Sequence, residues 1–316
     1  MGGLAAAVDL ARAGAEVTLL ERADHPGGKV RALDVAGQPV DTGPTVFTMR
    51  WLFEALFADA GVPLAEAVEL RPLEVLARHG WLDGSRLDLF ADLERSADAI
   101  ADFAGAGEAD AYRRFAARSE AIFDTLDHTF MRREKPGPVE LSLSLGVGGV
   151  PRLAATQPFS SLWRALGKTF RDPRLRQLFG RYATYCGSSP WAAPATLMLI
   201  AHAERAGVWT VAGGMPRLAE VLATLAEAQG AEIRLGTGVE RIETRKGAVE
   251  AVVTDSGERL PADGVVFNGD VAALGQGLLG PGVSRALPDR SSEPRSLSAV
   301  TWSLVGRCDG FPLHHH

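Results

Sequence analysis

Cysteines and long apolar runs are both scarce in this sequence. Its two cysteines, Cys186 and Cys308, stand more than a hundred positions apart in a chain of 316 residues. Two cysteines cannot build a disulfide framework or a four-cysteine zinc site, so a reducing, cytoplasmic setting is expected. No apolar run approaches the roughly 18 residues of a membrane span, and the N-terminus lacks the basic head and separate apolar stretch of a signal peptide. We therefore expect a protein that does not cross a membrane.

An excess of positive charge is also missing. The 33 lysines and arginines face 39 aspartates and glutamates, which gives a net charge of −6 and an isoelectric point near 5.7. No overall field draws such a molecule to phosphate backbones, so we expect no nucleic-acid partner. The histidines outside the terminal His314, His315 and His316 are isolated, and we expect no metal site. At about 150 residues per domain, the length predicts two domains.

The first twenty residues predict a helix followed by a strand. Apolar residues at positions 4, 7, 8 and 11 recur at helical spacing just after Gly2 and Gly3, and Gly14 supplies a stop. A short strand over 16–20 then ends at Glu21, eighteen positions beyond Gly3. In a dinucleotide-binding unit, the last glycine of the G-x-G-x-x-G turn and the acid that accepts ribose hydroxyls have about this spacing. The first two glycines of that motif and the strand before them are missing, so a helix that merely begins at two glycines stays a second interpretation.

Two glycine-containing turns follow the acid. Gly27 and Gly28 let backbone amides approach a pyrophosphate without a Cβ in the way, and Lys29 and Arg31 add positive charge. A plain Pro-Gly-Gly turn between strands is the alternative. The second turn contains a Gly-Pro pair that breaks a strand, within Asp41, Thr42, Gly43, Pro44 and Thr45. Its aspartate is either a cofactor residue or a simple turn former.

These segments carry a resemblance to a known family. Glu21, the 27–29 turn and the 41–45 segment are similar to the start of FAD-dependent amine oxidases and carotenoid desaturases. Residues 181–190, with the sequence RYATYCGSSP, and the later Gly213-Gly214-Met215-Pro216 resemble the phytoene desaturase family. Within that family, the chain most resembles the 1-hydroxycarotenoid 3,4-desaturases, also called methoxyneurosporene dehydrogenases. The similarity extends over essentially the whole chain.

The resemblance implies a two-lobed α/β fold with FAD as the cofactor. The discontinuous Rossmann-like FAD domain would comprise residues 1–50 and 208–270, without its first strand, and the mixed α/β substrate domain would comprise residues 51–207 and 271–316. The cofactor-binding residues would be Gly2, Gly3, Glu21, Gly27, Gly28, Lys29, Arg31, Asp41, Gly43, Pro44, Thr45 and Val239, the last of them beside the adenine. Family members are longer at both ends, so we expect the chain to be incomplete, to bind FAD weakly and to be inactive by itself.

The resemblance also implies a reaction. Removal of two hydrogens from adjacent carbons of an unactivated polyene needs a two-electron acceptor, which a flavin is and side chains are not. The substrate domain would hold a carotenoid so that hydride passes to the flavin and a C=C bond forms, at carbons 3 and 4 of a 1-hydroxy or 1-methoxy carotenoid. The electrons would then pass to an acceptor such as oxygen or a quinone. Spacing alone selects no catalytic residue.

Other functions stay open at this point. A phytoene-type desaturase, or another oxidoreductase of the flavin amine oxidase family, would share these motifs. Rab GDP-dissociation inhibitors have the same two-domain architecture but bind prenylated proteins without a flavin, so the fold alone also allows a lipid-binding chaperone. The presence of Glu21 together with Gly27 and Gly28 favours a cofactor.

The remaining periodicity outlines the two domains. Helical patterns dominate residues 51–207, with short strands around a turn at Asp83-Gly84, at 70–76 and 86–90. A helix over 216–228 is followed by expected strands at 231–235, 239–244, 248–254 and 258–261, the last three as a β-meander. The apolar run 263–268 predicts one more, buried strand. We expect residues 208–270 to rejoin the sheet begun by residues 1–45.

One stretch suggests contact with a lipid surface. Over residues 159–171 the apolar side chains and the cations fall on different faces of a helix, with Phe159, Leu162, Trp163, Leu166 and Phe170 on one and Arg164, Lys168 and Arg171 on the other. An interfacial helix has this division, and so does an ordinary amphipathic helix packed on a core. Together with the apolar, glycine-rich residues 141–150, the stretch leads us to expect peripheral attachment at the inner face of the cytoplasmic membrane.

Overall fold

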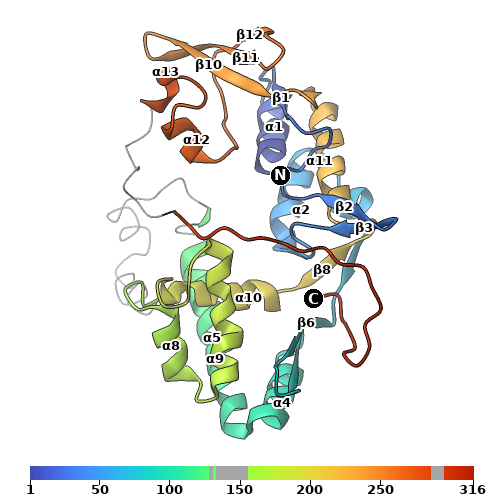
Figure 1. The fold of residues 1–316 in the computed structure, drawn as a ribbon, viewed down its shortest axis with the longest axis vertical. Coiled ribbons are helices and arrows are strands. Elements are labelled where there is room, and N and C mark those ends of the chain that lie inside the picture. Colours follow the sequence, from blue (N-terminus) through green and yellow to red (C-terminus); the bar gives the residue numbers. More distant parts are fainter. Residues whose placement is uncertain (128–130, 133–155, 286–294) are drawn as a thin grey trace. The chain divides into compact units, whose positions relative to one another are not determined.

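The chain folds into two compact units (Figure 1). A computed structural model describes residues 1–127, 131–132, 156–285 and 295–316. Unit 1 comprises Met1–Arg71, Thr210–Arg295 and Trp302–Val305, and unit 2 comprises Pro72–Trp209, Ser296–Thr301 and Gly306–His316. Residues 51–71 and 271–285 therefore belong to unit 1, although the sequence analysis assigns them to the substrate domain. Residues 141–150 lie outside the described part of the chain.

Unit 1 contains two packed helices and a short parallel sheet. α1 (Gly2–Arg12) and α11 (Pro216–Ala228) contact each other, and β1 (Thr18–Leu20) pairs in parallel with β9 (Glu232–Arg234) (Figure 1). The buried face of α1 consists of the residues that the helical spacing identifies, Leu4, Ala7, Val8 and Ala11. The pairing of β1 with β9 confirms that the later segment rejoins the sheet begun by the N-terminal one.

A hairpin and two further helices complete the N-terminal part of unit 1. β2 (Ala32–Val35) and β3 (Gln38–Asp41) are antiparallel. α2 (Arg50–Asp59) and α3 (Leu64–Ala67) follow, and three short strands form a sheet in the order β4 (Phe47–Thr48), β8 (Val208–Val211) and β5 (Leu70–Pro72). The Gln229 amide, just after α11, donates to the carbonyl of Ala60 at 3.1 Å. This bond ties the end of α2 to unit 1 and explains why residues 51–71 belong there.

The expected β-meander is confirmed. β10 (Val239–Arg245), β11 (Ala248–Thr254) and β12 (Arg259–Pro261) are antiparallel neighbours in that order. α12 (Val271–Gly275) and α13 (Pro281–Ser284) come after them. The backbone N–H of Ile242 in β10 donates to the carbonyl of Leu279 at 2.9 Å, which holds this segment on the meander.

The buried strand expected over 263–268 is wrong. These residues are irregular, and 66% of Val266 is exposed. An apolar run in a parallel sheet is buried by elements that cover both of its faces. The sheet of β1 and β9 contains no third strand in the described part of the chain, so the run has no partner to bury it.

Unit 2 is mostly helical and has an aromatic core. Its helices are α4 (Leu93–Ala104), α5 (Ala106–Leu126), α8 (Leu162–Thr169), α9 (Pro173–Gly180), η2 (Arg181–Cys186), η3 (Ala195–Met198) and α10 (Leu199–Arg205). The ring of Phe115 in α5 lies 5.4 Å from that of Phe170 and 4.7 Å from that of Phe179. Such pairs stabilise a core through dispersion and edge contacts in addition to their buried area.

A β-hairpin forms the other part of unit 2. β6 (Val75–Gly80) and β7 (Arg86–Phe90) are antiparallel. The single strand expected over 70–76 is divided between the end of β5 and the start of β6. The C-terminal residues of the chain lie along this hairpin. Arg78 donates to the carbonyl of Pro312, and Arg86 donates to that of Gly310, each at 2.7 Å.

The apolar face of α8 is part of the core of unit 2. Leu162, Leu166 and the following Phe170 are fully buried, and the Ser161 side chain caps the helix by accepting from the N–H of Arg164. The helix is therefore of the ordinary amphipathic kind, and the interfacial interpretation of this face is wrong. Phe159, which precedes the helix, is fully exposed.

Within the described ranges, no helix combines the length and the apolar character that crossing a bilayer requires. In the same ranges, no cluster of three or more His, Cys, Asp or Glu side chains is placed to hold a metal ion.

Candidate functional site

The start of α1 is open to an anion. No side chain caps this helix end, and no acidic residue lies in its first turn. The first N–H groups of a helix have no partner within the helix, and they carry partial positive charge. A Cβ added to Gly2 would lie 2.8 Å from Oδ1 of Asn268, and one added to Gly3 would lie 3.4 Å from Nδ2. Asn268 thus lies against the helix start, and its side chain would have to shift to admit a Cβ at Gly2.

Glu21 lies at the end of β1 and close to the start of α1. Its Oε1 accepts from the N–H of Ala23 at 3.0 Å, and its carbonyl accepts from the N–H of Thr237 at 2.9 Å. α1 and β1 contact each other, so the acid at the end of the strand lies in the same unit as the helix start. The arrangement of helix, strand and acid predicted from the sequence is therefore present in unit 1.

Val239 begins β10 beside the residue that follows Glu21. A Cβ added to Gly238 would lie 3.7 Å from Cβ of Arg22, and Val239 itself is half-buried opposite Thr254. The structure thus brings Val239 to the same end of the small sheet as the acid. Its expected position beside an adenine stays a prediction.

The two glycine turns contact each other. A Cβ added to Gly43 would lie 1.8 Å from the carbonyl oxygen of Lys29. Gly27 has φ +108°, and a Cβ there would lie 2.7 Å from Cβ of Ala219 in α11. Both glycines are therefore required by close backbone packing, whereas Gly28 has φ +64° with open space around its Cα. The charge of Lys29 acts on Asp270, so this turn lies near the segment that carries Asn268.

Asp41 has a structural partner that the sequence analysis does not predict. Its Oδ2 accepts from the backbone N–H of Met215 at 3.0 Å, at the start of α11. A Cβ added to Gly214 would lie 3.1 Å from Oδ1 of the same carboxylate. Asp41 is thus more than a turn former, because it caps a helix 174 residues further along the chain.

The other predicted residues surround this region. Arg31 accepts through its carbonyl from the N–H of Thr42 at 3.0 Å, which joins the two turns. The exposed residues among the predicted set are Gly2, Gly28, Lys29, Arg31, Gly43 and Pro44, and Thr45 is half-buried. A helix start with free N–H groups, an acid at the neighbouring strand end and two glycine turns fit a dinucleotide with its ribose and pyrophosphate. Contact of each residue with a cofactor stays a prediction.

A second polar cluster lies in unit 2, on the RYATYC motif. Arg181 donates to both carboxylate oxygens of Glu204 at 2.9 Å each. The hydroxyl of Tyr182 donates to Oε2 at 2.8 Å, and that of Tyr185 donates to Oε1 at 3.1 Å. The carboxylate of Glu204 thus accepts four hydrogen bonds. We call Arg181, Tyr182, Tyr185 and Glu204 the Arg181–Glu204 cluster.

The charges of this cluster are held in a largely buried place. Burial alone would raise the pKa of Glu204, but the hydrogen bonds from Arg181 and the tyrosines lower it below its ordinary value. Burial, followed by the charge of Arg181, lowers the pKa of the adjacent His79 to about 4. Burial also raises the pKa of Tyr182. At neutral pH the cluster therefore contains one ion pair and two neutral phenols, and the imidazole of the neighbouring His79 is neutral.

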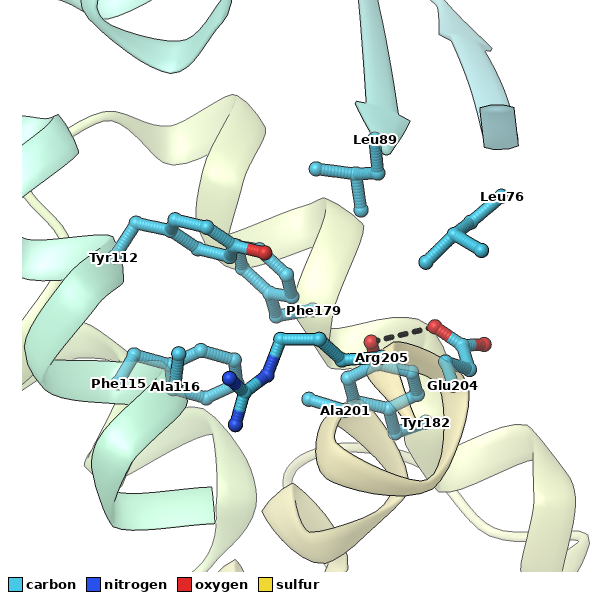
Figure 2. A pocket seen from close by; sticks show the side chains of 10 residues that line it. All are labelled: Leu76, Leu89, Tyr112, Phe115, Ala116, Phe179, Tyr182, Ala201, Glu204 and Arg205. Carbon is cyan, nitrogen blue, oxygen red and sulfur yellow. Dashed lines mark hydrogen bonds between the residues drawn. The ribbon is translucent and has the colours of Figure 1, made fainter. Parts of the chain in front are cut away.

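A small cavity borders the cluster (Figure 2). It measures about 20 Å³, and its mostly apolar wall includes Leu76, Leu89, Phe115 and Phe179, with the Tyr182–Glu204 hydrogen bond at one side. This volume is that of about one water molecule. The cavity is therefore too small to hold a polyene, and it is not a substrate tunnel.

Sequence reasoning missed two sets of residues. Asn268 could have been predicted from the sequence, because it ends an apolar run that has the pattern of a strand. Side chains at the carboxyl ends of strands contact ligands in α/β folds. Glu204 and His79 gave no such signal. Each is a single charged or polar residue within a helical or strand pattern, and only the fold brings them to Arg181.

Comparison with known proteins gives consistent matches. The family model described as "Flavin containing amine oxidoreductase" matches residues 1–302. A hydroxyneurosporene desaturase of Rubrivivax gelatinosus is 50% identical over 100% of this chain and 60% of its own length. A hydroxyneurosporene desaturase of Cereibacter sphaeroides is also 50% identical, over 100% of this chain and 64% of its own length. The chain thus spans less than two thirds of the length of either relative.

The fold is shared with a solved structure of lower identity. An oxidoreductase from Methanosarcina mazei superposes with a TM-score of 0.58 at 18% identity, over 92% of this chain and 61% of that one. Together with the mixed helices and sheets of both units, this match confirms the predicted α/β fold class.

Proposed function

The chain belongs to the flavin-containing amine oxidoreductases, and we propose that the whole protein desaturates a hydroxylated carotenoid. The observation that carries this proposal is the 50% identity, over the entire chain, to two hydroxyneurosporene desaturases. Those names agree with the resemblance found in the sequence. The proposal concerns the whole protein, because the chain spans only 60% and 64% of these relatives.

The family match confirms FAD as the predicted cofactor, and unit 1 offers the groups to hold it. Glu21 would accept from ribose hydroxyls, and the N–H groups at the start of α1 would bind the pyrophosphate. Gly43 lets the two turns contact each other, and Gly27 lets the first turn pack on α11. A bound flavin supplies the two-electron oxidation that side chains cannot perform.

The reaction makes a specific demand on the chain's own residues. The reacting carbons carry no activating group, so their placement and the exclusion of water are the protein's main contributions. We assign this role to unit 2 and to the remainder of the whole protein, at the level of the unit rather than of single residues. The electron acceptor is, in this proposal, oxygen or a quinone.

The first experiment measures the flavin. The full-length protein is purified, and its visible spectrum is compared with that of a Glu21→Ala variant. A flavin spectrum near stoichiometric amount that weakens in the variant supports the proposal. Full-length wild type without flavin would refute the oxidoreductase function and would favour the lipid-binding chaperone.

The second experiment identifies the substrate. Purified holoenzyme is incubated with hydroxyneurosporene, neurosporene and phytoene, under air or with a quinone in the absence of oxygen. Each added conjugated double bond moves the carotenoid absorption to longer wavelength, and mass spectrometry counts the two hydrogens lost. Turnover of phytoene in preference to hydroxyneurosporene would favour a phytoene-type desaturase.

We also propose that the protein lies in the cytoplasm and attaches peripherally to the membrane in which its substrate dissolves. The structure offers a different surface from the buried face of α8. Phe159 is fully exposed, 65% of Trp191 is exposed, and the ring of Trp191 lies 5.2 Å from that of Trp163. Aromatic side chains next to cations suit an anionic membrane interface, and Arg164 and Lys168 are exposed on the same helix as Trp163.

Liposome flotation tests this attachment. A Phe159→Ala, Trp191→Ala double variant removes the exposed rings without opening the core. We expect it to float with anionic liposomes much less than wild type. Equal flotation of the two proteins would contradict attachment through these residues.

A further inference from the structure

The side chain of Asn268 forms one wall of a recess at the start of α1. Its Nδ2 lies 3.7 Å from the position of a Cβ on Gly2 and 3.4 Å from that of a Cβ on Gly3. Its Oδ1 lies 2.8 Å from the first of these positions. Asn268 and Gly2 are both exposed, so the recess is open to solvent. A Cβ at position 2 would occupy it, and glycine leaves it accessible to a ligand.

The hydrogen-bond donors around this recess are unused. The N–H of Ala5 donates to the carbonyl of Met1 at 3.0 Å, so the N–H groups of residues 2–4 precede the first bond of the helix. Asparagine is among the residues that cap a helix most readily. In the described part of the chain, however, the Asn268 side chain forms no hydrogen bond to these groups or to any other. Both N–H bonds of Nδ2 are therefore available to a ligand.

The acid next to Asn268 in the sequence is already engaged. Oδ1 of Asp270 accepts from the N–H of Ala272 at 3.0 Å, which caps α12, and Oδ2 pairs with Arg295 at 2.6 Å. The first turn of α1 contains no acidic residue. A negatively charged group beside Gly2 would therefore be stabilised by the helix start, and the carboxylate of Asp270 is compensated by its own partners.

The pyrophosphate is the part of FAD that matches these donors. Its oxygens are negatively charged and only accept, whereas ribose hydroxyls also donate and the oxidised flavin ring is neutral. Helix starts that open with glycine bind phosphate groups through their backbone N–H groups. A side-chain donor beside them forms a stronger hydrogen bond to a charged oxygen than to a neutral one.

We propose that the side-chain amide of Asn268 donates to the pyrophosphate of FAD, which makes Asn268 a further cofactor-binding residue. This inference rests on the proposed function, in which the N–H groups at the start of α1 bind the same pyrophosphate. It also gives the irregular segment 263–268 a role, because this segment brings Asn268 to a helix at the other end of the sequence.

The test measures the Kd of FAD for the full-length protein after removal of its flavin, by isothermal titration calorimetry. We expect Asn268→Ala to raise Kd at least about tenfold, as the loss of one hydrogen bond to a charged group does. Asn268→Asp keeps the shape of the side chain but replaces its donors with a negative charge. It should raise Kd further, and added salt should reduce this extra loss because it screens the repulsion.

A matched control adds the same charge elsewhere in unit 1. Gln38 is exposed and pairs with Val35 at the turn end of the β2–β3 hairpin. Gln38→Glu converts a neutral amide into a carboxylate, as Asn268→Asp does, and should leave the Kd of FAD unchanged. A loss confined to the Asn268 variants therefore supports the inference.

A purely structural role for Asn268 predicts a different result. Aspartate caps a helix start as well as asparagine does, and its charge suits the helix dipole. Asn268→Asp would then keep or raise the melting temperature of the flavin-free protein and bind FAD like wild type. That combination overturns the inference.

The outcomes also separate this inference from the proposed function. A wild-type full-length protein that binds no FAD refutes the proposed function itself. A wild type that binds FAD, together with an Asn268→Ala variant that binds it equally tightly, overturns the role of Asn268 alone. The alanine variant decides the matter even where Asn268→Asp fails to fold.

Discussion

The carboxylate of Asp41 accepts a hydrogen bond from the backbone N–H of Met215, with 3.0 Å between Oδ2 and N. Asp41 ends the β2–β3 hairpin, and Met215 precedes the first turn of α11. The bond therefore joins the two longest of the three segments that make up unit 1. It also fixes the second glycine turn, which starts at Asp41, relative to the helix on which Gly27 packs.

Removal of this cap should destabilise unit 1. We expect Asp41→Ala to lower the free energy of unfolding by about 1 kcal/mol, because the N–H at the start of α11 loses its acceptor. Asp41→Asn is the control, since its side-chain carbonyl can still accept. Urea titration of both variants checks the difference, and equal loss in the two would mean that the charge, rather than the cap, is what matters.

Gly27 and Gly28 offer a matched pair for the first turn. Both have positive φ, but only at Gly27 would an added Cβ meet another atom, Cβ of Ala219 at 2.7 Å. We expect Gly28→Ala to lower the free energy of unfolding by about 1–2 kcal/mol, because alanine is strained in the left-handed backbone conformation. Gly27→Ala should cost about 1–3 kcal/mol more, from overpacking against α11. Thermal unfolding in parallel measures the gap, and two variants of equal stability would contradict the packing shown here.

Glu204→Gln should lower the stability of unit 2 more than the same change in an exposed ion pair does. The change removes the charge that compensates the largely buried Arg181, for which we expect a loss of about 3 kcal/mol. Glu94, which pairs with Arg113 at the surface at 2.7 Å, is the control. Its change to Gln should cost under about 1 kcal/mol. Guanidinium unfolding followed by the fluorescence of the tryptophans of unit 2 compares them.

The stability of unit 2 should fall in mild acid through His79. Its pKa is lowered from 6.5 to about 4 in the folded state, so below pH 6.5 the unfolded chain binds a proton that the folded chain does not. The free energy of unfolding should therefore decrease as the pH falls from about 6.5 to about 4. Urea titrations at several pH values in this window should show a shallower dependence for His79→Gln than for wild type. Identical slopes would show that His79 titrates alike in both states.

Local pattern determined much of unit 1. The helix of α1, the acid after β1 and the β-meander follow from apolar spacing and turn residues, and the structure has all three. The same reasoning failed for residues 263–268, because apolar character predicts burial without naming what covers it. It also left the face of α8 undecided, since an amphipathic period is the same whether the face meets a core or a membrane.

The polar contacts could not be predicted from the sequence, for a different reason. The partners Asp41 and Met215, and Arg181 and Glu204, are joined by the fold rather than by spacing. A single carboxylate in a sequence has dozens of candidate cations and N–H groups. Only the tertiary structure shows that Asp41 caps a helix and that Glu204 accepts four hydrogen bonds.

The pairing of β1 with β9 has a consequence for how the chain is made. Leu20 lies opposite Arg234, so its partner is synthesised 234 − 20 = 214 residues later. At about 5–20 residues per second, a ribosome needs roughly ten to forty seconds for that stretch. During this time residues 72–209 are synthesised, while β1 has no β9 with which to pair. The two strands of this small sheet therefore leave the ribosome on either side of the segment that forms most of unit 2.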